Sequence, residues 1–105
     1  MDEVEVRDNP DEARYELLVD GALAGSLTYR LGEGRITLVH TEVDDEHAGG
    51  GLGTRLARFA LDDARRRGLA VVPVCPFVAA IVKEHADEYL DEVVPAMRRR
   101  VIEES

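Results

Sequence analysis

The chain has 105 residues, of which 45% are hydrophobic and 33% charged, and its formal net charge at pH 7 is −9. This length predicts a single domain over residues 1–105. The negative charge argues against nucleic acid and anionic membrane as partners, and it favours a cationic substrate such as an amine. The single cysteine, Cys75, excludes an intramolecular disulfide and a metal site built on a cysteine pair, so no metal is predicted. The sequence has no signal-peptide pattern and no membrane-spanning apolar stretch, which predicts a cytoplasmic protein.

The first part of the chain consists of short strand-like segments joined by turns. Alternating or β-branched runs are separated by turn residues at 9–12 and 32–34, and by the pair Asp20-Gly21, which tolerates positive φ. Gly25 marks a candidate β-bulge. The predicted strands are residues 4–7, 13–19, 23–31 and 35–43. Four strands with such short connections predict an antiparallel meander.

Beyond the fourth strand the apolar residues change to helical spacing. The predicted apolar face of a helix over 52–67 consists of Leu52, Leu56, Phe59, Ala60 and Ala64. Gly68 is suited to end that helix, and the valine-rich segment 69–74 predicts a buried fifth strand parallel to the fourth. Further helices are predicted over 76–85, which opens on a proline, and over 92–105. The result is a mixed α/β (α+β) fold with an antiparallel four-stranded meander, a helix, a parallel fifth strand and C-terminal helices.

A glycine cluster between the fourth strand and the first helix is the clearest functional signal. Its members are Gly49, Gly50, Gly51 and Gly53. Glycine lets backbone N–H groups converge on an anion, and a helix start offers unpaired N–H groups at the positive end of its dipole. The cluster predicts a pyrophosphate site, with an ordinary flexible loop as the alternative. A Rossmann site is disfavoured because four antiparallel strands come first, and the Gly-Lys-Ser/Thr of a Walker loop does not occur.

Three segments resemble a known family. Residues Ala48–Gly53 match the pattern Arg/Gln-x-x-Gly-x-Gly/Ala that opens the central helix of the GNAT N-acetyltransferases, with Ala48 in place of the Arg or Gln. The sequence His-Thr-Glu-Val at 40–43, and the apolar strand that runs into Pro-Val-Cys-Pro-Phe-Val at 73–78, are similar to the small, single-domain members of that family. The resemblance covers residues 4–94.

This resemblance implies a GNAT fold that binds acetyl-CoA or CoA. The pantetheine arm would pair with the backbone of residues 38–43, between splayed fourth and fifth strands, and the thioester would lie near Cys75. The pyrophosphate would accept hydrogen bonds from the N–H groups of Gly49 to Thr54. Because Ala48 replaces the Arg or Gln of the family pattern, only backbone groups would bind the pyrophosphate there. The implied cofactor-binding residues are Val43, Gly49, Gly50, Gly51, Leu52, Gly53 and Thr54.

Acetyl transfer also needs groups that move protons. Many GNAT enzymes place a tyrosine on the helix after the fifth strand, but residues 79–82 are Ala-Ala-Ile-Val, and Tyr89 lies further along. Cys75 is the first catalytic candidate, as acetyl acceptor or as proton donor to the leaving thiolate; a buried, inert cysteine is the alternative. His40 and Glu42 share one strand face and are candidate bases, with structural hydrogen bonding as the alternative.

Three functions are compatible with these residues. The first is transfer of acetyl from acetyl-CoA to a small-molecule or protein amine, and the second is a non-catalytic acyl-CoA-binding module. The third is a structural partner protein whose C-terminal helix, with its arginines at 98–100, docks elsewhere. Arg55 and Arg58 are near enough to the glycine cluster to reach cofactor phosphates, or else they belong to a solvated helix face. Neither the acceptor nor the oligomeric state has a signal in the sequence.

Overall fold

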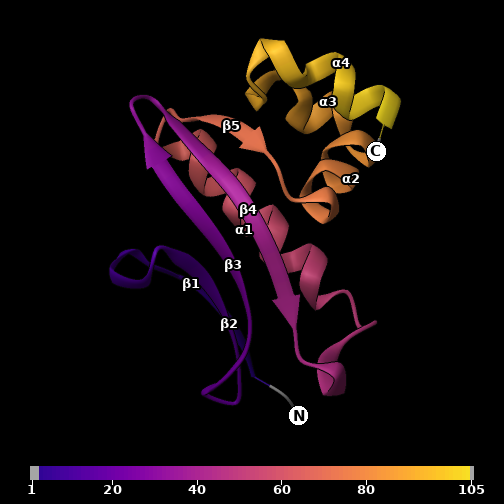
Figure 1. The fold of residues 1–105 in the computed structure, drawn as a ribbon. Helices are drawn as coiled ribbons and strands as arrows, with labels where there is room; N and C mark the ends of the chain where they lie inside the picture. Colours follow the sequence, from indigo (N-terminus) through magenta and orange to yellow (C-terminus); the bar gives the residue numbers. More distant parts are fainter. Residues whose placement is uncertain (1–2, 105) are drawn as a thin grey trace.

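A five-stranded mixed sheet with a long helix along one face forms the framework of the molecule (Figure 1). The computed structural model describes residues 3–104. The strands are β1 (Val4–Asn9), β2 (Arg14–Val19), β3 (Ala22–Gly32), β4 (Arg35–Val43) and β5 (Ala70–Pro73). The helices are α1 (Leu52–Arg66), α2 (Pro76–Glu84), α3 (Ala86–Tyr89) and α4 (Pro95–Glu104), with 3-10 turns η1 (Pro10–Glu12), η2 (Asp45–His47) and η3 (Leu90–Glu92).

The sheet order confirms the predicted meander. Neighbours from β1 to β4 pair antiparallel, and β5 joins the far side of β4 as a parallel strand. The predicted bulge is present beside Gly25, where β3 carries Ala24 as an extra residue against β2. A Cβ on Gly25 would lie 2.7 Å from the carbonyl oxygen of Glu42, so β4 passes too close for any side chain there.

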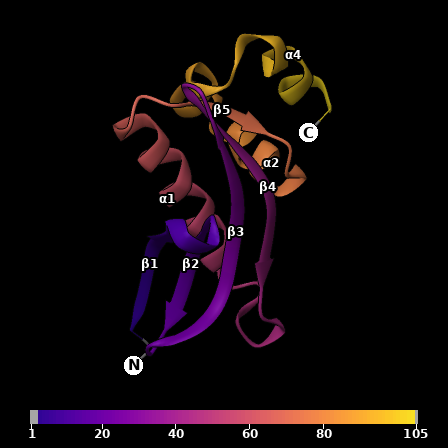
Figure 2. The ribbon, with the colours of Figure 1, turned by 60° about the vertical axis from the view of Figure 1, so that its left-hand side comes forward.

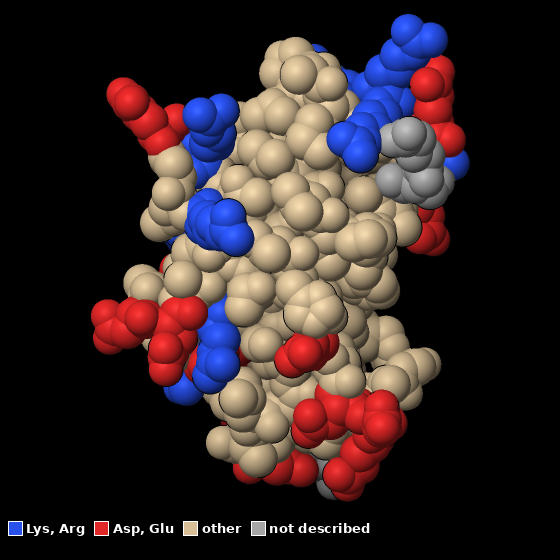
Figure 3. All heavy atoms as spheres, in the orientation of Figure 1, with Lys and Arg blue, Asp and Glu red and all other residues tan. Residues whose placement is uncertain are grey.

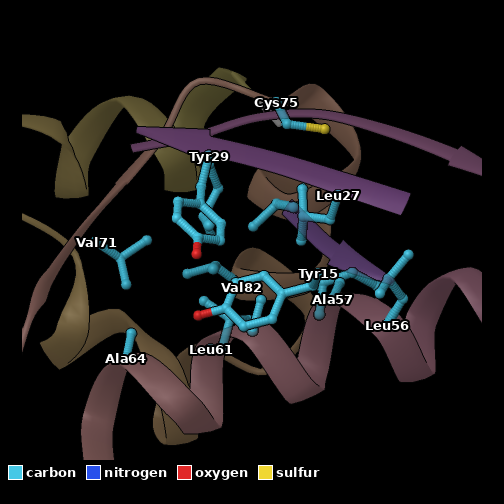
Figure 4. Close-up of a cluster of buried hydrophobic side chains, with 14 of the residues drawn as sticks. Tyr15, Leu27, Tyr29, Leu56, Ala57, Leu61, Ala64, Val71, Cys75 and Val82 are labelled. Carbon is cyan, nitrogen blue, oxygen red and sulfur yellow. The ribbon is translucent and has the colours of Figure 1, made fainter. Parts of the chain in front are cut away.

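The core lies between α1 and the sheet (Figure 4). Tyr15 and Leu17, two apart on β2, point to the same face and are fully buried, as a strand with one covered face requires. Tyr15 donates a hydrogen bond to Asp63 of α1 at 2.8 Å, so the polar end of this buried ring has a partner. The apolar face of α1 therefore packs directly on β2 and its neighbours.

One residue of the predicted apolar face of α1 lies at the rim and not in the core. Phe59 keeps 37% of its surface exposed and packs edge-on against Tyr15, with the ring centroids 5.8 Å apart. Ala57 and Leu61 occupy the fully buried positions next to it. The difference arises because Phe59 lines an open hollow between α1 and β1 together with Val4 and Val6, so this side of the apolar stripe is not closed over by the sheet.

Several element boundaries differ from the predicted ones. Gly68, at φ +70°, ends α1, and its neighbour Leu69 donates to the carbonyl of Ala64, so Leu69 belongs to the helix cap and β5 begins one residue later. The last helix begins at Pro95 because residues 86–92 form α3 and η3.

The C-terminal elements are tied back to β5 and α1. The Val94 N–H donates to the carbonyl of Val71 at 2.9 Å, and the Tyr89 hydroxyl donates to Asp62 of α1 at 3.0 Å. Figure 2 shows the result: α1 runs along one face of β3 and β4, and the lower halves of these strands are open on the other face. Among residues 3–104, no helix is long and apolar enough to cross a membrane.

Candidate functional site

β4 and β5 separate halfway along β4. Their parallel register ends where Leu38 lies opposite Pro73, and the Cys75 N–H then closes the pairing with a hydrogen bond of 2.9 Å to the Leu38 carbonyl. After Cys75 the chain turns into α2, whose first residue is Pro76. Residues 40–43 of β4 therefore pair with β3 on one side only, and within the described chain the other edge of residues 39–43 has no strand partner.

A β-bulge at Val39 sets which side chains face the open edge. The β3–β4 register shifts there, because Val39 is extra in β4. Ile36 and Leu38 face the core before the bulge, so regular alternation would send residues 40 and 42 inward. The extra residue reverses this phase, and Thr41 and Val43 take the α1 side.

The loop between β4 and α1 presents a run of backbone amides without intramolecular partners. The first helical hydrogen bond of α1 runs from the Arg55 N–H to the Gly51 carbonyl at 3.1 Å. Between Ala48 and Arg55, no N–H donates to another described backbone group. Gly49 and Gly51 have φ of +84° and +80°, which only glycine adopts readily.

A cavity of about 330 Å³ lies where the open edge of β4 meets this loop. It is lined by Thr41, Val43, Ala48, Gly49, Gly51, Gly53, Thr54 and Phe77. A Cβ on Gly53 would lie 3.2 Å from the Phe77 ring and 3.6 Å from Val43, so this glycine keeps the space between α1 and α2 open. The cavity thus joins the unpaired strand edge to the unpaired amides.

Cys75 lies behind Thr41, which lines this cavity, and is not itself a lining residue. Its Sγ is 3.3 Å from the Thr41 hydroxyl, a distance at which either atom can be the donor. Cys75 is 3% exposed. The backbone of Cys75 is therefore held by the last paired residue of β4, Leu38, and its thiol lies against Thr41 in the open part of the strand.

His40 and Glu42 form a pair on the opposite face of β4. The His40 Nε2 lies 3.2 Å from the Glu42 Oε1, so the two side chains meet as their spacing predicts. They are 63% and 72% exposed, respectively. Cys75 approaches β4 from the α1 side through Thr41, whose side chain alternates with those of His40 and Glu42. The three predicted catalytic residues thus flank the open edge from two faces and make no direct contact with one another.

Tyr89 does not lie in this site. Its side chain is fully buried, its hydroxyl donates to Asp62, and burial together with that carboxylate raises its pKa well above the ordinary value. The guanidinium of Arg58 lies 5.5 Å from the Tyr89 ring centroid. This tyrosine therefore fixes the C-terminal elements to α1 and is not accessible as an acid for a reaction at Cys75.

Acidic residues surround the outer end of the site. Figure 3 shows a red cluster at the end of the molecule where η2 lies, and the exposed acidic residues there are Asp44, Asp45 and Glu46. The middle of the same face, over β3, β4 and β5, carries few charges. A cation that approaches the open edge of β4 from this end meets a negative rim.

Two lining residues lay outside the sequence-based prediction. Thr41 stands between the two residues chosen as bases, and Phe77 follows the helix-opening Pro76. Alternation along β4 puts His40 and Thr41 on opposite faces, and the bulge at Val39 is what turns Thr41 to the cavity. Phe77 had no comparable signal, since an aromatic residue in the first turn of a helix is most often core.

Comparison with known proteins supports the interpretation of the fold. A family model described as GCN5-related N-acetyltransferase matches residues 14–93, which include the open edge of β4, the glycine loop, α1 and Cys75. β1 and α4 lie outside the match. No curated protein matches the chain. The matched segment covers most of the 105 residues, so the chain belongs to the GCN5-related N-acetyltransferase family, and its function is of the acetyltransferase type.

Proposed function

We propose that the chain binds acetyl-CoA along the open edge of β4 and transfers the acetyl group to an amine, as a single domain. The observation that carries this proposal is continuity: an unpaired strand edge over residues 39–43 leads through a cavity into the unpaired amides of Gly49–Thr54. An amide-containing arm can form hydrogen bonds with the strand edge, and a pyrophosphate can accept hydrogen bonds from the loop amides. Val43 and the loop residues are then the cofactor contacts.

In this proposal the Cys75 thiol acts on the leaving group. In the direct reaction a neutral amine nitrogen forms a bond to the acetyl carbon, the carbon–sulfur bond breaks, and the CoA thiolate needs a proton. In the proposed mechanism Cys75 supplies that proton, and its own hydrogen bond with the Thr41 hydroxyl orients the thiol. Its burial at the divergence of β4 and β5 keeps water away from the thioester.

In the same proposal the His40–Glu42 pair accepts the proton that the amine loses. Both side chains are exposed on the face of β4 that no helix covers, so an acceptor arriving from solvent meets them first. Glu42 accepts from one imidazole nitrogen and orients the ring, which leaves the other nitrogen free for the substrate proton. The acidic residues at 44–46 attract a cationic amine to the same end.

Calorimetric titration with acetyl-CoA, followed by turnover assays on a panel of small amines and a lysine-containing peptide, tests the proposal. His40→Gln should lower kcat/KM by about 10²-fold with acetyl-CoA affinity unchanged, because a general base contributes at least that factor. The matched control is His85→Gln, at the far end of α2. Absence of heat at high micromolar acetyl-CoA contradicts the whole proposal, whereas equal rates for the two variants contradict the role of His40.

Cys75→Ser distinguishes a thiol that donates a proton from a thiol that accepts the acetyl group. A serine retains a weak proton donor next to Thr41, so a residual rate in Cys75→Ser and none in Cys75→Ala supports proton donation. Intact mass after incubation with acetyl-CoA alone provides an independent measurement. A mass increase of one acetyl group that disappears in Cys75→Ser indicates that the thiol accepts the acetyl group instead.

A non-catalytic acyl-CoA-binding module is the second candidate. The observation that favours it is the lack of a tyrosine on α2, together with the burial of Tyr89 away from the cavity. It predicts acetyl-CoA binding with no turnover on any amine, and no effect of His40→Gln in either measurement. The same pair of assays therefore distinguishes the two candidates.

A further inference from the structure

The strand β1 ends the sheet and has no strand neighbour on its outer side within the described chain. β1 pairs only with β2, and Figure 2 shows it at the outer side of the sheet. We propose that this edge pairs with the β1 of a second copy of the chain, antiparallel about a two-fold axis at Val6, so that one sheet runs through both copies. The inference is independent of the proposed function, because β2 and β3 separate β1 from the open edge of β4.

β1 lacks the features that usually protect an exposed strand edge. Its six residues, Val4–Asn9, pair with β2 in an unbroken register, without a bulge, a proline or a lysine. The hollow of about 670 Å³ between β1 and α1 lies beside it, and its apolar wall includes Val4, Val6 and Phe59. All three side chains keep part of their surface exposed. A regular edge next to apolar surface is suited to pairing with another strand.

The hydrogen bonds of β1 with β2 fix which backbone groups point outward. The Asp20 N–H donates to the Glu3 carbonyl at 2.7 Å, so in this antiparallel ladder the odd-numbered residues of β1 exchange hydrogen bonds with β2. The N–H and C=O groups of Val4, Val6 and Asp8 therefore point away from β2. A two-fold axis at Val6 pairs Val6 with its own copy and Val4 with Asp8, so all three outward residues gain partners.

The charged side chains of β1 complement one another in this register. Glu5 and Arg7 lie on the face of β1 away from α1, and the axis at Val6 sets Glu5 of each copy directly opposite Arg7 of the other. The Glu5 side chain is exposed and has no hydrogen bond or ion pair with a described residue. Glu16 binds Nε and Nη2 of Arg7, which holds the guanidinium on this face and leaves Nη1 to donate. Two ion pairs therefore form across the axis.

The neighbouring two-fold registers of the same edge bring like charges together. An axis at Glu5 or at Arg7 sets that charge opposite its own copy. An axis at Val4 sets Glu5 opposite Glu3. An axis at Asp8 sets two carboxylates opposite each other. The proposed register is therefore the one in which backbone pairing and charge agree.

Analytical ultracentrifugation of the full chain measures the association. The experiment uses about 0.15 M salt, which screens the repulsion between two chains of net charge −9 more than it screens ion pairs in contact. The mass should rise with concentration from that of one chain toward twice that value. Glu5→Arg should weaken the association about tenfold, because the axis makes one substitution act at two contacts. Glu33→Arg makes the same charge change at an exposed position in the β3–β4 turn and should not weaken it.

Cysteine cross-linking tests the register. Val6→Cys should form a covalent dimer under mild oxidation, because the two Cα atoms of a hydrogen-bonded antiparallel pair lie about 5.5 Å apart, within disulfide range. Val4→Cys is the matched control, since its two copies would be offset by about 13 Å along the strands. The wild type should give no covalent dimer under the same conditions, because Cys75 is buried.

Three outcomes would overturn the inference. The first is a chain that keeps the mass of a monomer at millimolar concentration. The second is a dimer that Glu5→Arg leaves unchanged, or that Val4→Cys cross-links as efficiently as Val6→Cys, because β1 would then not pair in this register. The third is a chain that stays monomeric while a lysine-containing peptide shifts the amide NMR signals of Val4 and Val6, which would assign the edge to a peptide partner. Acetyl-CoA affinity enters none of these measurements.

Discussion

The two halves of β4 and α1 differ in how many of their backbone groups have hydrogen-bond partners. In the closed half, residues 35–38 pair on both edges, and the C-terminal part of α1 packs its side chains against buried partners. In the open half, residues 39–54, one strand edge and six successive amides have no backbone partner in the described chain. β4 and α1 therefore each contain a part whose backbone groups are hydrogen-bonded and a part whose backbone groups are not. The bulge at Val39 separates the two parts of β4.

Burial away from the open half is balanced by specific partners, also outside β4 and α1. Glu16, which is 2% exposed, accepts hydrogen bonds from Arg7, Asn9 and Arg14, and these bonds lower its pKa despite the desolvation that acts to raise it. The open half leaves its polar groups unpaired where a ligand can reach them. We therefore expect substitutions in the closed half to change stability and substitutions in the open half to change binding.

Leu61→Ala tests the closed half with the largest expected effect. Leu61 is fully buried on α1, and removal of a buried leucine side chain leaves a cavity that costs about 3 kcal/mol in the free energy of unfolding. Acetyl-CoA affinity at a temperature where the variant is folded should stay within about twofold of wild type. Denaturant unfolding and calorimetric titration measure the two quantities. A large loss of acetyl-CoA affinity in the folded variant would contradict the expectation that substitutions in the closed half change stability and not binding.

Glu92 of η3, outside both halves, is an exception to this balance, and it predicts a pH dependence. Its side chain is 7% exposed, its carboxylate oxygens accept no hydrogen bond from the described residues, and the Arg65 guanidinium lies 3.3 Å away as an ion pair. Desolvation raises its pKa to about 7, against the opposing effect of Arg65. The folded state therefore holds a proton that the unfolded state releases near pH 4.5.

Because the native state binds more protons between pH 4.5 and 7, this group's contribution to stability is full below pH 4.5 and falls as the pH rises to 7. The expected loss is about 2 kcal/mol across that range, after allowance for relaxation around the carboxylate. Glu92→Gln should abolish this loss and be more stable than wild type at pH 8. Denaturant unfolding at pH 5, 6, 7 and 8 measures it, with Glu103→Gln as an exposed control. Parallel profiles for both variants and wild type would exclude Glu92 as the cause.

Much of the closed half follows from the sequence. Period-two alternation and short turns predicted the meander and the exact bounds of β4, 35–43, because local pattern and burial agree there. The buried partnership of Tyr15 and Asp63 could not be predicted, because it joins residues 48 positions apart that neither propensity nor periodicity connects. Phe59 was misplaced because helical spacing identifies an apolar stripe but not how closely the neighbouring strands cover it.

For the open half, the sequence predicted which residues lie there but not which way their side chains face. The glycines predicted unpaired amides at the start of α1, and the structure has them there. The bulge at Val39 had no signal, since valine is an ordinary strand residue and the extra position is defined only by pairing with β3. That bulge decides which of His40 and Thr41 faces the cavity, so the division of the candidate catalytic residues between two faces required the structure.

Gly51→Ala tests the open half with the smallest expected effect on stability. Gly51 has φ of +80°, and an alanine there adds strain of about 1 kcal/mol or rotates the peptide and misdirects the neighbouring amides. Acetyl-CoA affinity should fall about tenfold. A substitution with the same small effect on stability at a position away from the ligand should leave this affinity unchanged. Gly50→Ala is the matched control, because Gly50 lacks a positive φ and its added Cβ would lie 3.8 Å from the nearest neighbour, the His47 carbonyl oxygen. If both variants bind acetyl-CoA equally well, the amides of this loop do not hold the pyrophosphate, and the unpaired edge of β4 alone accounts for binding.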